Sequence, residues 1–60
     1  MFATLFLLDG KPCKVNTRSI DFVAQRDAST SIVHMADGTE FNVKGDLEYV
    51  GKYLDSVERS

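Results

Sequence analysis

Apolar residues fall into five short blocks along the first three quarters of the chain, and residues typical of turns separate them. The first block, 2–8, is apolar at almost every position, so we expect the strand that it predicts to be covered on both faces. In the third block, Ile20 and Phe22 would share one face of a strand. The predicted strands are residues 2–8, 11–16, 20–26, 31–35 and 39–44.

Two Asp-Gly pairs, Asp9-Gly10 and Asp37-Gly38, lie between predicted strands. Such pairs supply the positive φ angles that tight hairpin turns need, so each predicts a β-hairpin. Pro12 follows the first pair and cannot donate a hydrogen bond to a neighbouring strand. We therefore expect its position to begin a strand or to face an open sheet edge.

The last fifteen residues change to a helical period. Asp46 follows Gly45 and predicts a helix N-cap, because its side chain can accept backbone N–H groups. Gly51 within this helix costs about 1 kcal/mol relative to Ala, which predicts a close approach of helix and sheet. The apolar stripe, spaced by three and four residues, consists of Leu47, Val50, Tyr53, Leu54 and Val57.

These elements predict an α+β fold, mostly β. About five short antiparallel strands would be followed by one C-terminal amphipathic helix, in a single domain, 1–60. The positions of the four phenylalanines, Phe2, Phe6, Phe22 and Phe41, predict that their rings lie in the core. A chain this short sits near the lower limit of independent stability, so we expect a homodimer or a larger partner.

The chemistry-bearing residues are sparse. Cys13 is the single cysteine and His34 the single histidine, so neither a disulfide nor a zinc site is expected. His34 would be a half-buried residue of a strand, with no nucleophile and acid placed to work with it. The carboxylates show no paired spacing and the glycines are isolated. We therefore predict no enzyme activity, no catalytic residues, no cofactor and no metal.

Charge and the N-terminal segment bear on partners and location. A net charge of −2 argues against nucleic acid, because phosphate binding usually requires a basic excess. The apolar start is short and lacks a positive flank, so it predicts neither a signal peptide nor a membrane span. The lone thiol agrees with a reducing compartment, and the cytoplasm is the expected location.

One pattern runs through nearly the whole chain and is carried by Leu7-Leu8-Asp9-Gly10-Lys11, Val15-Asn16, Ile20, Phe22, Ile32-Val33, Asp37-Gly38 and Phe41-Asn42-Val43-Lys44. This pattern resembles the small flagellar accessory proteins of the FlbD/SwrD family, which share an apolar first strand, a turn of this type and a closing helix. The resemblance implies a cytoplasmic protein that supports flagellar function and has no enzymatic site. Departures are the Asp before both turn glycines, and Gly45-Asp46.

Residues 19–57 are also similar to the end of the LytTR output domain of bacterial response regulators, which implies DNA binding. The basic residues expected at the DNA-facing loops of such a domain are sparse in this chain. A third possibility is a phage-encoded or regulatory protein that inhibits or modulates a host enzyme or defence complex, since an acidic minidomain can block a basic cleft.

The residues expected to bind a partner form two groups. Tyr49 and Tyr53 are one helical turn apart, with Lys52 between them, and tyrosines are enriched at protein interfaces. A second group is basic and would serve a nucleic-acid partner if there is one. It consists of Lys11, Lys14 and Arg18, with Arg26 added in the nucleic-acid interpretation.

Overall fold

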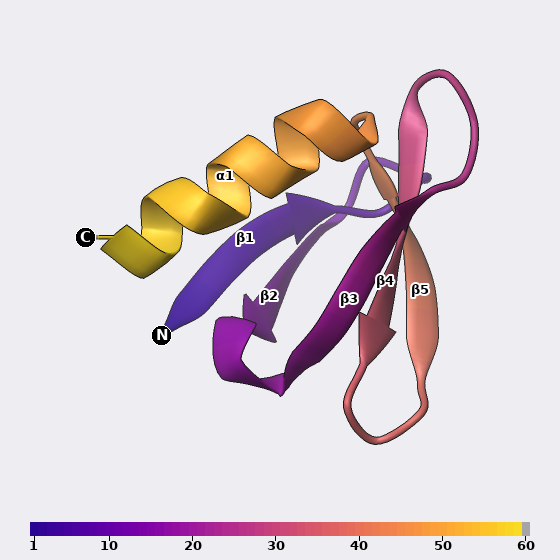
Figure 1. Ribbon diagram of the computed structural model, residues 1–60. Helices are drawn as coiled ribbons and strands as arrows, with labels where there is room; N and C mark the ends of the chain where they lie inside the picture. The colour runs from indigo at the N-terminus through magenta and orange to yellow at the C-terminus, as the bar shows by residue number, and fades with distance from the viewer. Residues whose placement is uncertain (60) are drawn as a thin grey trace.

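The computed structural model describes residues 1–59, which form five strands, one short 3-10 helix and one α-helix. The strands belong to two antiparallel sheets and the α-helix follows the last strand, so the predicted fold class is confirmed (Figure 1). The bounds are β1 Phe2–Phe6, β2 Pro12–Asn16, η1 Thr17–Ser19, β3 Ile20–Gln25, β4 Thr30–Met35, β5 Glu40–Lys44 and α1 Leu47–Arg59.

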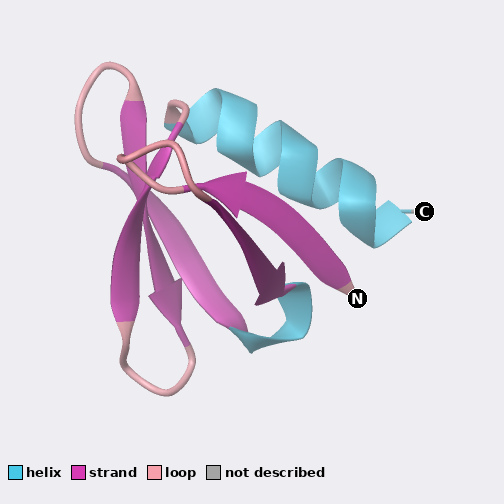
Figure 2. Cartoon of the chain, turned by 180° about the vertical axis from the view of Figure 1, so that it is seen from behind, coloured by secondary structure: helices cyan, strands magenta, loops and turns pink. Residues whose placement is uncertain are grey.

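The two sheets meet at one point. β1 and β2 form a hairpin, and β3, β4 and β5 form a three-stranded meander in that order. A single bridge between Leu7 and Val43 joins the hairpin to β5. Beyond this bridge β1 diverges from β5, and α1 runs alongside β1 in both views (Figure 1 and Figure 2). β2 and β3 are therefore the outermost strands of the arrangement.

Both predicted hairpin turns are present and share one geometry. Leu7 accepts a hydrogen bond from the Gly10 amide and donates one to the Lys11 carbonyl, each 2.9 Å long. Gly10 has a φ of +88°, while Asp9 keeps a negative φ and its Oδ1 accepts the Lys11 amide at 2.9 Å. Asp37-Gly38 repeats this arrangement, with a glycine φ of +95°. The glycine supplies the left-handed residue and the aspartate locks the turn.

The core is small and consists mainly of valine. Alternate positions of the strands point toward one another and toward α1, whose Val50 is fully buried. The partly buried residues that pack around this core are Cys13, Ile20, Val23, Met35, Phe41, Tyr53 and Leu54. The buried apolar residues are Ala3, Leu5, Val15, Val33, Val43 and Val50.

The phenylalanine prediction is wrong for three of the four rings. Phe2, Phe6 and Phe22 are 63%, 49% and 51% exposed, and only Phe41 packs against the core. In β1 the core-facing positions are Ala3 and Leu5, so the alternate positions point outward, and no element within residues 1–59 buries Phe2 or Phe6 there. The expectation that β1 is covered on both faces is therefore wrong as well.

A bulge in β3 explains the error at Phe22. The pairing with β4 shifts between Ile20 and Phe22, so strict alternation does not hold through this segment. Ile20 and Val23 pack against the core, whereas Phe22 lies on the outer face of the sheet. The prediction that Ile20 and Phe22 share one face is wrong for this reason.

The start of α1 is fixed by groups from the strands as well as by its own cap. The Tyr49 amide donates to Asp46 Oδ1 at 2.8 Å, which confirms the predicted N-cap. The Leu47 amide donates to Gln25 Oε1 at 2.7 Å, so a side chain at the end of β3 satisfies a second helix-terminal donor. Buried Ser31 donates to the Gly45 carbonyl at 2.8 Å.

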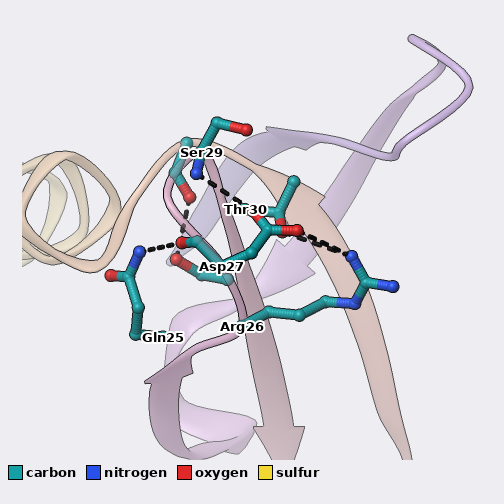
Figure 3. A network of polar contacts seen from close by, with 7 residues as sticks. Gln25, Arg26, Asp27, Ser29 and Thr30 are labelled. Atoms are coloured by element: carbon teal, nitrogen blue, oxygen red, sulfur yellow. Dashed lines mark hydrogen bonds and ion pairs between the residues drawn. The ribbon is translucent and has the colours of Figure 1, made fainter.

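Gln25 also ties the turn between β3 and β4 to this junction. Its side-chain amide donates to the Asp27 carbonyl, and Arg26 reaches the Asp27 carboxylate and the Thr30 hydroxyl (Figure 3). The Ser29 amide donates to the Asp27 carboxylate at 3.0 Å. The turn is thus held in a defined position against the first turn of α1.

The close approach predicted from Gly51 is wrong. A Cβ built at Gly51 would meet no atom within 4 Å. The close approach occurs at Gly45 instead, where φ is +109° and a Cβ would lie 2.6 Å from Tyr49 Cδ2. Only glycine fits the chain reversal that places the Tyr49 ring here.

Candidate functional site

The contact between β1 and α1 joins residues that are 49 positions apart. The Thr4 amide donates to the Tyr53 hydroxyl at 2.9 Å. Because Leu7 bonds to Lys11 across the β1–β2 hairpin, alternation directs the Thr4 amide to the side of β1 away from β2. The Tyr53 hydroxyl therefore accepts the Thr4 amide, which points away from β2, while the Tyr53 ring packs against the core.

Tyr49 lies one helical turn before Tyr53 and is exposed to a greater degree. Its side chain is 66% exposed, and its ring lies over Gly45 at the junction of β5 and α1. A tyrosine needs no such exposure for stability, since burial of an aromatic ring is favourable. The exposed ring is thus available to a second molecule.

A groove of about 270 Å³ lies between β1 and the first turns of α1. It brings together both predicted tyrosines with Phe6 and Lys44, which sequence reasoning did not select. Phe6 was missed because it was expected in the core, and Lys44 because the link between the end of β5 and the groove exists only in the fold. This aromatic groove is lined by Thr4, Leu5, Phe6, Lys44, Tyr49 and Tyr53.

Phe2 extends the apolar surface beyond the groove. Phe2, Thr4 and Phe6 alternate with the buried Ala3 and Leu5, so they share the outward face of β1. Phe2 is the more exposed of the two phenylalanines on this face. The aromatic groove together with Phe2 forms what we call the aromatic surface.

The other predicted partner-binding residues do not join the aromatic surface. Lys52 pairs with Glu48 at 3.1 Å on the solvent side of α1, where both side chains are 77% exposed. Lys11, Lys14 and Arg18 are exposed and follow β2 from the turn before it to η1 after it. With a rise of about 3.3 Å per residue, the three basic side chains are spread over the length of β2. They therefore do not form one cluster of positive charge.

A second hollow separates the two hairpins, β1–β2 and β4–β5. It has a volume of about 530 Å³, within the range of small-molecule pockets. Four apolar side chains of its wall are half-buried, so they are less exposed to solvent than Phe2, Phe6 and Tyr49 of the aromatic surface. These four are Leu7, Cys13, Met35 and Phe41. The cleft is lined by Leu7, Cys13, Lys14, Val15, Asn16, Ser19, Met35, Asp37 and Phe41.

His34 occupies a row of three residues across the outer face of the second sheet. Its ring stacks on Phe22 with a centroid distance of 4.1 Å and an interplanar angle of 13°, and its Nδ1 lies 3.2 Å from Glu40 Oε2. Register places the three side chains directly opposite one another on β3, β4 and β5. His34 is half-buried, as the sequence predicts, and its neighbours account for it as a cross-strand packing residue.

Within residues 1–59, no group of three or more His, Cys, Asp or Glu side chains is placed to hold a metal ion. The helices in this part of the chain are too short or too polar to cross a membrane. Comparison with known proteins finds no family model, no curated protein and no solved structure that matches the chain. The aromatic surface is therefore the candidate site on geometry alone.

Proposed function

We propose that the chain is a non-catalytic protein-interaction module that binds another protein through the aromatic surface. The exposure of Phe2, Phe6 and Tyr49 on one side of the molecule supports this proposal. Each large apolar side chain left in water forgoes about 1.5 to 3 kcal/mol of burial free energy, which a partner can recover. Clustered exposed aromatics of this kind mark protein interfaces.

The resemblance to the FlbD/SwrD family supports a partner linked to bacterial flagella, in the cytoplasm. The alternative is that the same surface blocks a host enzyme or a defence complex. The two alternatives differ in the identity of the captured protein and not in the surface used, so one experiment separates them.

The experiment is affinity capture from lysate of the source cell, followed by mass spectrometry. The full chain is compared with Phe6→Asn and with Phe22→Asn as a matched control. Both phenylalanines are about half exposed, but Phe22 lies on the outer face of β3. We expect the partner to be retained by the wild type and by Phe22→Asn and lost by Phe6→Asn, since loss of a hot-spot residue costs about 2 kcal/mol or more.

Circular dichroism of both variants checks that the fold is kept. Flagellar or motor proteins among the lost set support the family assignment, and a host enzyme or defence protein supports the inhibitor alternative. A partner that Phe6→Asn retains and Phe22→Asn loses would overturn the assignment of the surface.

A further inference from the structure

The wall of the aromatic groove contains one basic side chain, that of Lys44. Among residues 1–59 the close pairs of basic and acidic side chains are Arg26–Asp27, His34–Glu40 and Lys52–Glu48, and Lys44 belongs to none of them. Its ammonium lies above the turn at Gly10, where an added Cβ would be 3.7 Å from Nζ. Within the described residues, Lys44 thus lines the groove without an ion-pair partner.

Asp9 is the acid of this turn, and its carboxylate is hydrogen-bonded to the turn backbone. Its Oδ1 accepts the Lys11 amide at 2.9 Å as part of the turn, and it forms no ion pair with Lys44. The lining of the groove contains no carboxylate at all. An incoming anion would meet the ammonium without a competing acid in the groove wall.

The other groups that line the groove favour a ligand that has an apolar part and a hydrogen-bond acceptor. Phe6, Tyr49 and Tyr53 supply ring surface. The Tyr53 hydroxyl accepts from Thr4, so its own hydrogen remains available for donation. The volume of about 270 Å³ lies just below the range of drug-sized pockets, which matches one large side chain and not a whole helix.

We propose that the aromatic groove recognises an acidic peptide segment, in which one large apolar side chain lies beside a carboxylate. The apolar side chain packs against Phe6 and Tyr49, and the carboxylate pairs with Lys44. This inference rests on the proposed function and adds the chemistry of the partner to it. Charge complementarity of this kind contributes mainly to partner choice and association rate.

A fragment that carries both groups tests the inference without knowledge of the partner. The probe is 3-phenylpropanoate, and its neutral counterpart is 3-phenylpropanamide. Titration of the full ¹⁵N-labelled chain at millimolar probe concentrations, followed by amide chemical shifts, gives the site and the dissociation constant. We expect shifts at Thr4, Phe6, Tyr49 and Tyr53, and about threefold tighter binding of the carboxylate, as for an exposed ion pair.

Two matched variants assign the selectivity to one ammonium. Lys44→Met keeps most of the apolar stem and removes the charge, so it should bind the two probes equally. Lys52→Met removes a charge from the solvent side of α1, outside the groove, and should retain the threefold preference. The preference should also shrink at high salt, because exposed pairs are screened.

Equal binding of the two probes to the wild type would overturn the acidic-partner inference, and so would shifts that map outside the groove. Neither result touches the capture experiment, in which Phe6→Asn is compared with Phe22→Asn. Failure of the partner chemistry can therefore be told apart from failure of the proposed function.

Discussion

Gly45 and Gly51 lie within one helical turn of Tyr49 but meet different surroundings. Gly45 adopts a φ of +109°, and a side chain there would collide with Tyr49 and Val50 at 2.6 and 3.2 Å. Gly51 lies inside α1, has no positive φ and has open space around it. The left-handed backbone at position 45 requires glycine. Gly51 lowers the stability of the helix, and neither its backbone angles nor its surroundings require a glycine.

Replacement of these glycines should therefore have opposite effects. Gly51→Ala should stabilise the chain by about 1 kcal/mol, because it removes unfolded-state entropy and a poor helix residue. In a domain of this size that is a rise of about 4 to 8 °C in the melting temperature. Gly45→Ala should destabilise it. Thermal unfolding followed by circular dichroism measures both, and a stabilising Gly45→Ala would contradict the assigned backbone geometry.

The Asp37 turn provides a pH dependence with a defined sign. The Thr39 hydroxyl at 2.7 Å and the Thr39 amide at 3.0 Å donate to Asp37 Oδ1, and they hold the pKa of that carboxyl below its ordinary value of 3.8. A pKa that is lower in the folded state stabilises the protein above the unfolded pKa. That stability is lost as the pH falls through the folded value.

Asp37→Asn should therefore flatten the acid side of the stability profile. The asparagine keeps a side-chain acceptor for the Thr39 amide but has no proton to gain. Urea midpoints measured from about pH 7 down to about pH 3 should fall less in the variant than in the wild type. Parallel profiles for the two proteins would show that this turn does not contribute to the pH dependence.

At the scale of elements, composition and period predict what forms but not which face is buried. The strands, both glycine turns and the Asp46 cap follow from local chemistry, so the sequence was sufficient for them. The apolar run of β1 left its two faces equivalent, and only packing against α1 and the second sheet selects Ala3 and Leu5 as the buried positions. The bulge in β3 has no signal in the residue pattern, and it reverses the expected orientation of Phe22.

The N-terminus of α1 gives a prediction at this scale. Asp46→Ala should cost about 1 kcal/mol, because the Tyr49 amide loses its acceptor at the first turn. Asp46→Asn keeps an acceptor oxygen and should lose much less. Chemical denaturation of the two variants gives the difference. An equal loss in both would mean that the negative charge at the helix dipole matters more than the hydrogen bond.

At the scale of the whole molecule, the candidate site was half visible in the sequence. Tyr49 and Tyr53 were selected from their helical spacing, and the fold places both at the groove. Phe6 and Lys44 come from β1 and β5, two strands from different sheets that the Leu7–Val43 bridge joins. Residues that meet through such non-local contacts carry no local pattern by which sequence reasoning could group them.

The outermost strands give a prediction about assembly. β2 begins at Pro12 and carries Lys14, which blunt its free edge, whereas β3 has neither Pro nor Lys. In a chain of 60 residues with a small core, we expect two β3 edges to pair about a two-fold axis. Light scattering at micromolar concentrations should give the mass of a dimer.

Ala24→Lys beside this edge should lower that mass and Phe6→Asn should not, because Phe6 lies on β1. A strictly monomeric wild type would rule this assembly out. If Phe6→Asn alone loses the dimer, the two copies contact each other through the aromatic surface and not through β3.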